Sequence, residues 1–235
     1  MITLNGISFA YPAHPVLQNL QASFLPGQFY GLFGPNGCGK STLLKIITGE
    51  LKAQQGKITP VYPDALSRAQ NLAVLEQEIP PRIPLTVQEI IRLGQYPWQR
   101  QGEGKSDCLE QAMELLHLQE LCRQPYNRLS GGERQRVMLA RVLAQDTPAL
   151  LLDEPASSLD VGFRYGFYQT LQELCRQGKC IVMVSHDLFI APKFLDCALL
   201  LHQGRILASG PPAAVLSGSN LHQVFHCPPD LWPRP

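Results

Sequence analysis

The chain has 235 residues, a formal net charge of +1, and 45% hydrophobic and 17% charged residues. This composition is typical of a globular protein long enough to bury a substantial core. The near-zero charge provides no global field that would attract nucleic acid or acidic lipid, and every apolar run is far shorter than the roughly 20 residues that span a bilayer.

The N-terminal part of the chain predicts short strands. Residues 2–33 alternate apolar runs with turn signals, which we interpret as antiparallel strands. The apolar run Phe29–Phe33 predicts a buried strand, and Lys40–Thr48 has a helical pattern that ends at Gly49. Turns are expected at Asn5 and Gly6, at Tyr11 and Pro12, and at Pro26 and Gly27.

Between this strand and helix lies the glycine-rich loop GPNGCGKS, residues Gly34–Ser41. Its glycines allow the backbone to wrap around the β- and γ-phosphates of a nucleotide, while Lys40 supplies a positive charge and Ser41 a hydroxyl ligand for Mg²⁺. A strand, a glycine-rich loop and a helix in this order form the context of a phosphate-binding site. The expected nucleotide-binding residues are Gly34, Pro35, Asn36, Gly37, Cys38, Gly39, Lys40, Ser41 and Thr42.

Residues 79–128 predict a helical insertion between two parts of an α/β core. After a proline-rich break, Thr86 and Glu89 form a capping-box pattern that opens a short helix. A second helix is expected from Ser106 or Asp107. Its apolar face is expected to carry Leu109, Ala112, Met113 and Leu116.

A second glycine-rich turn, LSGGE, spans Leu129–Glu133 and opens a helix expected over residues 133–145. Ser130 and Glu133 again form a capping-box pattern, and the free N–H groups at a helix start make an anion site. The chain thus has two phosphate cradles but one phosphate-binding lysine. This suggests that the second cradle serves a nucleotide held by another copy, through Ser130, Gly131 and Gly132. The arginines expected on solvated or intersubunit faces are Arg134, Arg136 and Arg141.

Two further apolar strands end in polar residues. The strand Ala149–Leu152 leads to Asp153 and Glu154, and the strand Cys180–Val184 leads to His186, with a helix expected over residues 161–177. Alternating strands and helices predict a mostly parallel sheet covered on both sides. Functional residues are then expected at the carboxyl ends of the strands.

These strand ends allow catalytic roles, each with a plainer alternative. Asp153 can reach a magnesium-bound water and Glu154 can polarise the attacking water as a general base, although paired acids after a strand also act as helix caps or surface groups. His186 can contact the γ-phosphate or be a structural histidine. Tyr11 can stack on an adenine ring or pack against the core.

Together these motifs resemble those of the ATP-binding subunits of ABC transporters, over residues 2–225. GPNGCGKST is similar to their Walker A motif, LLLDEP to Walker B, LSGGERQR to the signature, SSLD to the D-loop and SHD to the switch histidine. The resemblance implies that the chain uses ATP and Mg²⁺. It implies catalytic roles for Lys40, Gln77, Glu154 and His186, metal contacts for Ser41, Gln77 and Asp153, and further nucleotide contacts for Tyr11 and Asp160.

The resemblance also implies a fold and an assembly. The expected fold is α/β, with a P-loop NTPase core of mostly parallel sheet (residues 1–78 and 129–225), an N-terminal antiparallel β subdomain, a helical insertion subdomain (about 79–128) and a loose tail (226–235). Two copies are expected to pair head to tail, so that each ATP lies between the Walker A motif of one copy and the signature of the other. Further expected partners are integral-membrane permease subunits and, indirectly, an extracytoplasmic substrate-binding protein. The chain is expected at the cytoplasmic face of the inner membrane, without nucleic acid.

The segment PLTVQEIIRLGQYPWQ, residues 84–99, narrows the resemblance to importer ATPases for iron–siderophore complexes, haem and cobalamin. It departs from them with Gln95 where arginine is usual and Trp98 where histidine is usual. A generic surface helix is the plainer interpretation of this segment. Zinc or manganese importer ATPases, and soluble single-cassette ATPases of iron–sulfur cluster assembly, are alternatives for the whole chain.

Cysteine and histidine usage adds little chemistry. Seven cysteines without a C-x-x-C pair are typical of reduced thiols. His222, His226 and Cys227 are a metal-site alternative near the C-terminus. Because three ligands without a fourth are incomplete, a plain surface helix end is the expected structure there.

Overall fold

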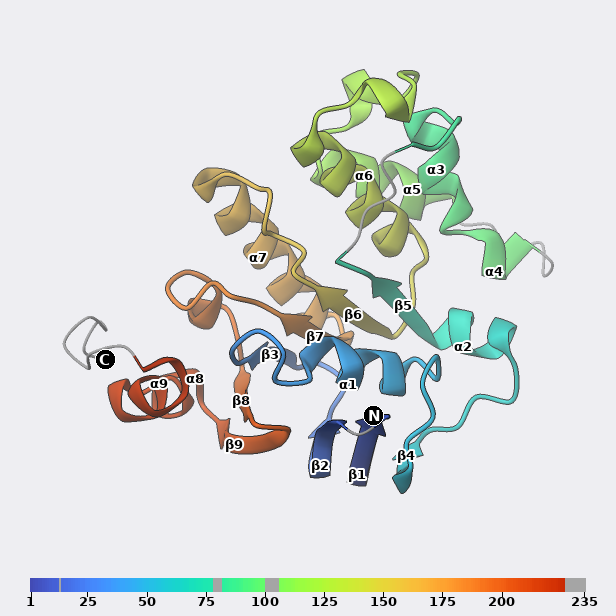
Figure 1. The fold of residues 1–235 in the computed structure, drawn as a ribbon. Helices are drawn as coiled ribbons and strands as arrows, with labels where there is room; N and C mark the ends of the chain where they lie inside the picture. Colours follow the sequence, from blue (N-terminus) through green and yellow to red (C-terminus); the bar gives the residue numbers. More distant parts are fainter. Residues whose placement is uncertain (13, 78–81, 100–105, 227–235) are drawn as a thin grey trace. The chain divides into compact units, whose positions relative to one another are not determined.

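The computed structural model (Figure 1) describes residues 1–12, 14–77, 82–99 and 106–226. The chain forms two compact units. The first comprises Met1–Val61 and Leu171–Pro235, and the second comprises Tyr62–Thr170. No helix in the described parts of the chain is both long and apolar enough to cross a membrane.

The first unit contains a three-stranded antiparallel sheet in the order β2-β1-β4 (Figure 1). Its strands are β1 (Ile2–Tyr11), β2 (His14–Phe24) and β4 (Gln55–Thr59). The turn predicted at Asn5 and Gly6 is wrong, because β1 is continuous there. Gly6 has a φ of 65°, and the pairing with β2 shifts between Leu4 and Ile7, as in a β-bulge. A glycine in the left-handed region has the same local sequence signal in a bulge as in a turn.

The first unit also contains a mostly parallel set of strands. The strand β3 (Phe29–Phe33) pairs in parallel with both β7 (Cys180–Val184) and β8 (Cys197–His202), and β9 (Arg205–Gly210) runs antiparallel to β8. Every residue of β3 and β7 is buried. Continuous apolar runs of this kind are typical of parallel strands covered on both faces. The prediction that residues 2–33 form antiparallel strands is therefore wrong for β3, which pairs in parallel with both of its neighbours.

Short helices complete the first unit. Helix α1 (Lys40–Ile47) buries Leu43, Leu44, Ile46 and Ile47, and Gly49, two residues beyond its end, has a φ of 77°. Toward the C-terminus lie the 3-10 helix η3 (Ala191–Lys193), helix α8 (Pro212–Val215) and helix α9 (Gly218–Phe225). The predicted tail beyond residue 226 lies outside the described residues.

The second unit combines a parallel strand pair with helices. The strands are β5 (Leu72–Leu75) and β6 (Ala149–Asp153). The helices are α2 (Ala65–Asn71), α3 (Val87–Leu93), α4 (Tyr96–Gln99), α5 (Ser106–Leu115), η1 (Gln119–Leu121), η2 (Tyr126–Arg128), α6 (Gly131–Ala144) and the start of α7 (Val161–Arg176). Helices α3 and α5 both pack against α6 (Figure 1).

Both predicted capping boxes are present in the second unit. The Thr86 hydroxyl accepts the backbone N–H of Glu89, whose carboxylate in turn accepts the N–H of Thr86. Ser130 and Glu133 make the same pair at the start of α6. Each box satisfies N–H groups that a helix start leaves without intrahelical partners. Helix α3 therefore begins directly after Thr86 and α6 directly after Ser130, two residues earlier than the predicted start at residue 133.

Candidate functional site

The phosphate loop of the first unit leaves no room for side chains at two of its glycines. Gly34 has a φ of 150° and Gly39 a φ of 109°, in the region that favours glycine. A Cβ at Gly34 would meet the backbone oxygen of Leu201 on β8, and one at Gly39 would lie 2.6 Å from Cδ2 of Leu17 on β2. The loop is therefore held closely between the two sheets of this unit, with its backbone rather than side chains forming its inner surface.

Lys40 is buried at the start of α1, with 6% of its surface exposed. Its ammonium donates to the backbone oxygens of Gly34 at 2.8 Å and Pro35 at 2.9 Å. The side chain thus curls back over the loop that precedes it. The next residue, Ser41, is exposed, so its hydroxyl is accessible from solvent.

Cys38 lies inside the same loop with a buried thiol. Burial raises the pKa of this thiol, and the nearby charge of Lys40 only partly opposes the effect. A thiol with a raised pKa stays protonated and weakly reactive at neutral pH. Cys38 therefore contributes its backbone to the loop, as its position in the motif predicts.

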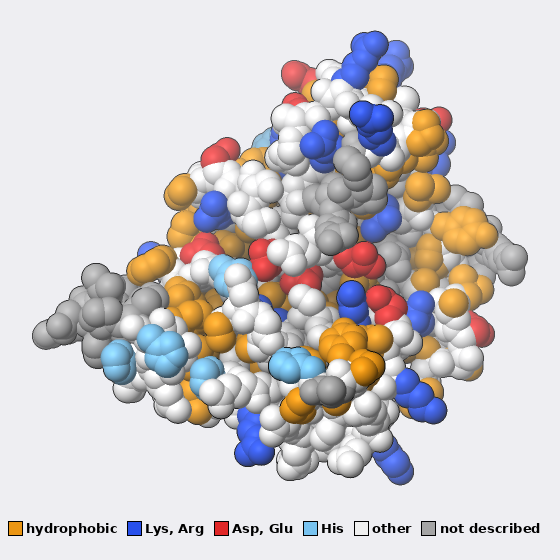
Figure 2. Space-filling model, in the orientation of Figure 1, with side chains coloured by type: hydrophobic (Ala, Val, Ile, Leu, Met, Phe, Trp, Pro, Cys, Tyr) orange, Lys and Arg blue, Asp and Glu red, His pale blue; other side chains and the backbone are white. Residues whose placement is uncertain are grey.

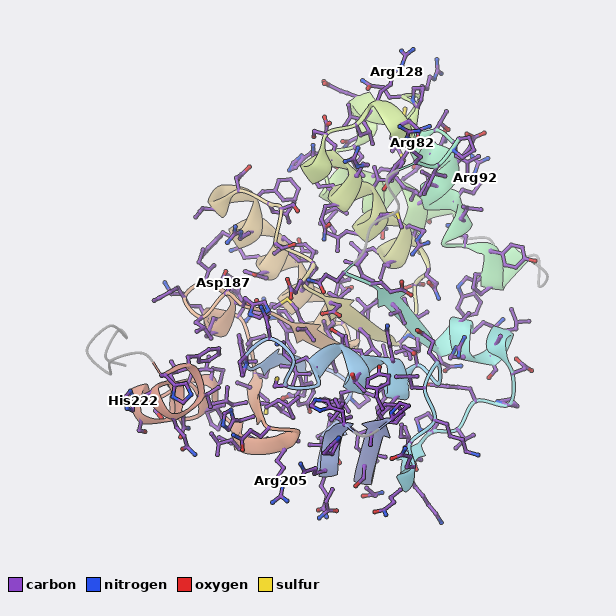
Figure 3. The ribbon with its side chains drawn as sticks, in the orientation of Figure 1. Arg82, Arg92, Arg128, Asp187, Arg205 and His222 are labelled. Atoms are coloured by element: carbon purple, nitrogen blue, oxygen red, sulfur yellow. The ribbon has the colours of Figure 1, made fainter. Side chains whose placement is uncertain are left out.

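His186 follows the buried strand β7 in a tightly bonded turn. The Ser185 hydroxyl accepts the N–H of Asp187 at 3.0 Å. The Asp187 carboxylate accepts the N–H groups of Phe189 at 3.0 Å and Ile190 at 2.8 Å. Asp187, labelled in Figure 3, thus fixes the loop after β7. The imidazole of His186 is exposed at the carboxyl end of its strand, the position expected for a functional residue in a parallel sheet.

Tyr11 closes the hairpin of β1 and β2. Its ring packs edge-on against Phe9, with centroids 5.0 Å apart and an interplanar angle of 89°, yet 43% of the residue stays exposed. On β2, the Val16 side chain lies 3.2 Å from the position of a Cβ at Gly39. The hairpin that presents Tyr11 therefore also touches the phosphate loop, and Phe9 fixes the Tyr11 ring without covering it.

The signature turn lies in the second unit, at the start of α6. The carboxylate of Glu133 accepts the N–H of Ser130 at 2.7 Å. The hydrogen bonds from Ser130 lower the pKa of the Glu133 carboxyl. A Cβ at Gly131 would meet nothing within 4 Å, which marks an open surface at the N–H groups of the helix start. This is the geometry of an anion site, without a lysine in the turn itself.

The end of β6 carries both predicted acids of the second unit. Asp153 is the last residue of the strand and 6% exposed, whereas Glu154 is half-buried. Glu154 has a φ of 51°, in the left-handed region that few residues other than glycine adopt. The backbone oxygen of Glu154 accepts the N–H of Ser157 at 3.3 Å and its hydroxyl at 3.1 Å. Such strained residues cluster at functional sites.

Gln77 and Asp160 occupy loop positions of the second unit. Gln77 is exposed, two residues after the end of β5. Asp160 precedes α7, and its carboxylate accepts the N–H of Phe163 at 2.8 Å. Asp160 therefore caps this helix, as a D-loop aspartate leading into a helix would.

The arginines after the signature, expected on solvated or intersubunit faces, are half-buried. Two of them also bind backbone oxygens within the second unit. Arg134 donates to Leu129 at 2.9 Å, and Arg136 donates to Leu116 at 2.9 Å and His117 at 3.1 Å. Burial lowers the pKa of the third, Arg141. Their partners are distant in sequence or are backbone atoms, so the local pattern of charges did not indicate them.

The structure adds one polar residue that the sequence did not single out. Gln135 is only 3% exposed, and its amide donates to the backbone oxygen of Pro155 at 3.0 Å. It lies between two arginines in the sequence, which favours a solvated side chain. The only available signal was helical periodicity, since Gln135 precedes the buried positions Met138 and Leu139 by three and four residues.

The donor atoms of the predicted metal residues fit Mg²⁺ by their chemistry. Ser41 supplies a hydroxyl, Gln77 an amide oxygen and Asp153 a carboxylate, and Mg²⁺ prefers such hard oxygen ligands. Within the described residues no three His, Cys, Asp or Glu side chains form a metal-binding group. Cys227 lies outside these residues, whereas His222 lies on α9 (Figure 3) and His226 follows the end of this helix with a φ of 57°.

The fold and these motifs define a P-loop nucleotide-binding protein with a second, signature-type glycine turn. The comparison with known proteins agrees. Residues 17–157 match the family model described as ABC transporter. The chain is 38% identical to the hemin import ATP-binding protein HmuV of Nocardia farcinica, over 95% of this chain and 80% of that protein.

Solved structures give the same result. A metal-chelate type ABC transporter in an inward-facing conformation matches with a TM-score of 0.80 and 28% identity, over 97% of this chain and 89% of that chain. A dimeric bacterial ABC transporter cassette matches with a TM-score of 0.79 and 27% identity, over 90% of this chain and 99% of that chain. The chain belongs to the ABC transporter family, as an ABC ATPase with the P-loop NTPase fold. The predictions of fold class and enzyme class are confirmed.

Proposed function

We propose that the chain is the ATP-hydrolysing subunit of an importer for haem or a related iron chelate, and that two copies work head to tail. The observation that carries this proposal is the pair of glycine-rich helix starts, Gly34–Ser41 and Leu129–Glu133, with one phosphate-loop lysine between them. The first holds the phosphates of the chain's own ATP, and the second closes over the ATP of the partner copy. Both offer backbone N–H groups to phosphate oxygens.

The contacts of Lys40 and Tyr11 support their roles in nucleotide binding. An ammonium has three N–H donors, and Lys40 uses two of them on the loop oxygens of Gly34 and Pro35. The third serves a phosphate oxygen. Tyr11 stacks on the adenine, with Phe9 holding its ring in place. Asp160, at the start of α7, lies at the contact with the partner copy.

The remaining residues carry out hydrolysis. Ser41, Gln77 and Asp153 would hold Mg²⁺, which would supply positive charge to neutralise the phosphates. Glu154 accepts the proton of the attacking water as a general base. His186 holds the γ-phosphate and orients this water through a hydrogen bond. Hydrolysis then reopens the closed pair of chains.

The dimer is tested by removing the base while keeping the side-chain shape. Glu154→Gln is expected to bind ATP normally, to lower turnover about a hundredfold or more, and to accumulate as an ATP-bound dimer in gel filtration. Glu173→Gln is the matched control, because Glu173 is an exposed residue of α7 that pairs with Arg176 on the same helix. Hydrolysis at the wild-type rate in Glu154→Gln would show that Glu154 is not the base.

Likeness to the HmuV and metal-chelate proteins supports the cargo and the membrane partner. An ATPase that drives import needs permease subunits, which place it at the cytoplasmic face of the inner membrane, and an extracytoplasmic binding protein delivers the chelate to them. Exposed apolar side chains on the second unit offer a docking surface. They are Leu66 on α2, Leu93 on α3 and Tyr96 on α4, exposed by 36%, 51% and 61%, and Figure 2 shows apolar side chains over α4.

Co-purification tests the importer. The tagged chain is expressed in its native host and purified from membranes extracted with mild detergent. A multi-spanning membrane protein is expected to co-purify with it. Leu93→Asp together with Tyr96→Asp should abolish this, whereas Val61→Asp, which changes an apolar residue 85% exposed on the first unit, should not. Recovery of a soluble complex instead of a membrane protein would contradict the importer and favour an ATPase of cluster assembly.

A further inference from the structure

The signature helix α6 is joined to the segment that follows β6 by contacts at its first two turns. Near the start of α6, a Cβ at Gly132 would lie 3.3 Å from the backbone oxygen of Ser158, in the D-loop. One turn further along, the buried amide of Gln135 donates to the backbone oxygen of Pro155 at 3.0 Å. Pro155 directly follows the strained residue Glu154. The signature turn and the loop beyond the proposed base are thus in direct contact.

A third contact joins the same helix to the residues after the D-loop. The guanidinium of Arg136 lies over the ring of Phe163, 5.2 Å from its centroid. It also donates to the backbone oxygens of Leu116 and His117, which hold it in place. The His117 ring meets the same phenyl ring edge-on, with centroids 5.8 Å apart and an interplanar angle of 74°. The Phe163 ring therefore contacts both a cation and a second aromatic ring.

Phe163 is also hydrogen-bonded to Asp160. Its backbone N–H donates to the Asp160 carboxylate at 2.8 Å, in the first turn of α7. In the next residue, Arg164 donates through Nε to the backbone oxygen of Leu159 at 2.7 Å. The D-loop is thus fixed to α7, and α7 is fixed to α6 through the ring of Phe163.

We infer that Gln135, Arg136 and Phe163 form a positioning clamp that couples the two ATP sites of the dimer. This inference rests on the proposed function. In the head-to-tail pair, α6 of one chain serves the partner's ATP, whereas the loop after Glu154 serves the chain's own ATP. A contact that makes α6 and this loop move together links the two sites. Closure at one ATP site then favours closure at the other. Energetic coupling needs such an element, one that both sites bias.

The cation–π contact can be removed with little change in volume. Phe163→Leu removes the aromatic face and keeps an apolar side chain, and Phe163→Tyr keeps the face. In the wild type, ATP hydrolysis by the full chain should rise cooperatively with ATP concentration. Phe163→Leu is expected to lower kcat about tenfold, since small misplacements of catalytic groups cost up to about a hundredfold, and to bring the Hill coefficient to about one. ATP binding to the separate chains should change less than twofold.

Rescue and control variants separate a clamp from an ordinary packing contact. Phe163→Tyr should keep both kcat and cooperativity at the wild-type level. Arg136→Lys should resemble Phe163→Leu, because lysine lacks the planar guanidinium group. Arg176→Ala, in an exposed residue at the end of α7, should have no effect. Cooperative hydrolysis at the wild-type rate in both Phe163→Leu and Arg136→Lys would overturn the inference. Dimer formation is tested separately by Glu154→Gln, which should still form a dimer when ATP is bound. If Glu154→Gln stays monomeric with ATP, the result contradicts the proposed function and not the clamp in particular.

Discussion

Two glycines of the phosphate loop provide a matched pair of alanine substitutions. Gly34 and Gly37 both have positive φ values, of 150° and 76°. A methyl group at Gly37 would meet nothing within 4 Å, whereas at Gly34 it would meet the backbone oxygen of Leu201 and lie 2.7 Å from the Cys38 sulfur. Gly37→Ala therefore tests backbone strain alone, and Gly34→Ala tests strain together with a steric clash.

The expected costs follow from these contacts. An alanine held at a left-handed φ costs about 1–2 kcal/mol, so Gly37→Ala should lower the free energy of unfolding by about that amount. Gly34→Ala adds an overpacking cost of about 1–3 kcal/mol, and the clashing oxygen belongs to β8, which cannot move without disturbing its pairing with β3. The total, about 2–5 kcal/mol, is a large fraction of the 5–15 kcal/mol that is usual for a protein.

Urea unfolding of both variants measures the difference. The midpoint should fall further for Gly34→Ala than for Gly37→Ala, with the same dependence on urea. ATP binding adds a second readout, since displacement of β8 at Gly34→Ala distorts the loop that holds the phosphates. Equal loss of stability in the two variants would refute the steric argument and leave only the positive φ as the reason for glycine.

Two further predictions concern the adenine and the signature. Tyr11→Ala should weaken ATP binding about fivefold, because ring stacking contributes on the order of 1 kcal/mol. Tyr11→Phe keeps the ring and should bind ATP as the wild type does in equilibrium titration. Equal loss of affinity in both variants would exclude stacking. Hydrogen bonds from Ser130 hold the pKa of the Glu133 carboxyl below its usual value of about 4.3, so its contribution to stability is present above that value and is lost as the pH falls through the lower folded value. The difference in Tm between the wild type and Glu133→Gln should therefore be present at pH 7 and vanish in acid, and a pH-independent difference would contradict this linkage.

Local chemistry made much of the fold predictable from the sequence. The capping boxes at Thr86 and Ser130 involve side chains three residues apart, so the sequence contains both partners of each hydrogen bond. The strands β3 and β7 are fully buried runs whose ends carry the predicted residues. Their apolar character alone predicts burial on both faces.

What the sequence did not reveal depends on partners that are distant along the chain. Arg136 binds backbone oxygens about twenty residues away and a ring on another helix. Gln135 reaches a backbone oxygen with the same separation. Backbone acceptors have no signature in the sequence, so such contacts cannot be inferred from residue types. The bulge at Gly6 was missed for a different reason, since its local pattern also fits a turn.

In the proposed head-to-tail dimer, the two glycine-rich cradles of one chain bind two different ATP molecules. This is tested most directly by mixing two inactive variants, Lys40→Ala, which damages only the phosphate loop, and Ser130→Arg, which obstructs only the signature. Each variant alone should hydrolyse ATP poorly, because both sites of its dimer are damaged. A mixed dimer regains one intact site, formed by the phosphate loop of one chain and the signature of the other, so the mixture should recover activity well above either variant. A mixture as inactive as its components would contradict a site shared between two chains.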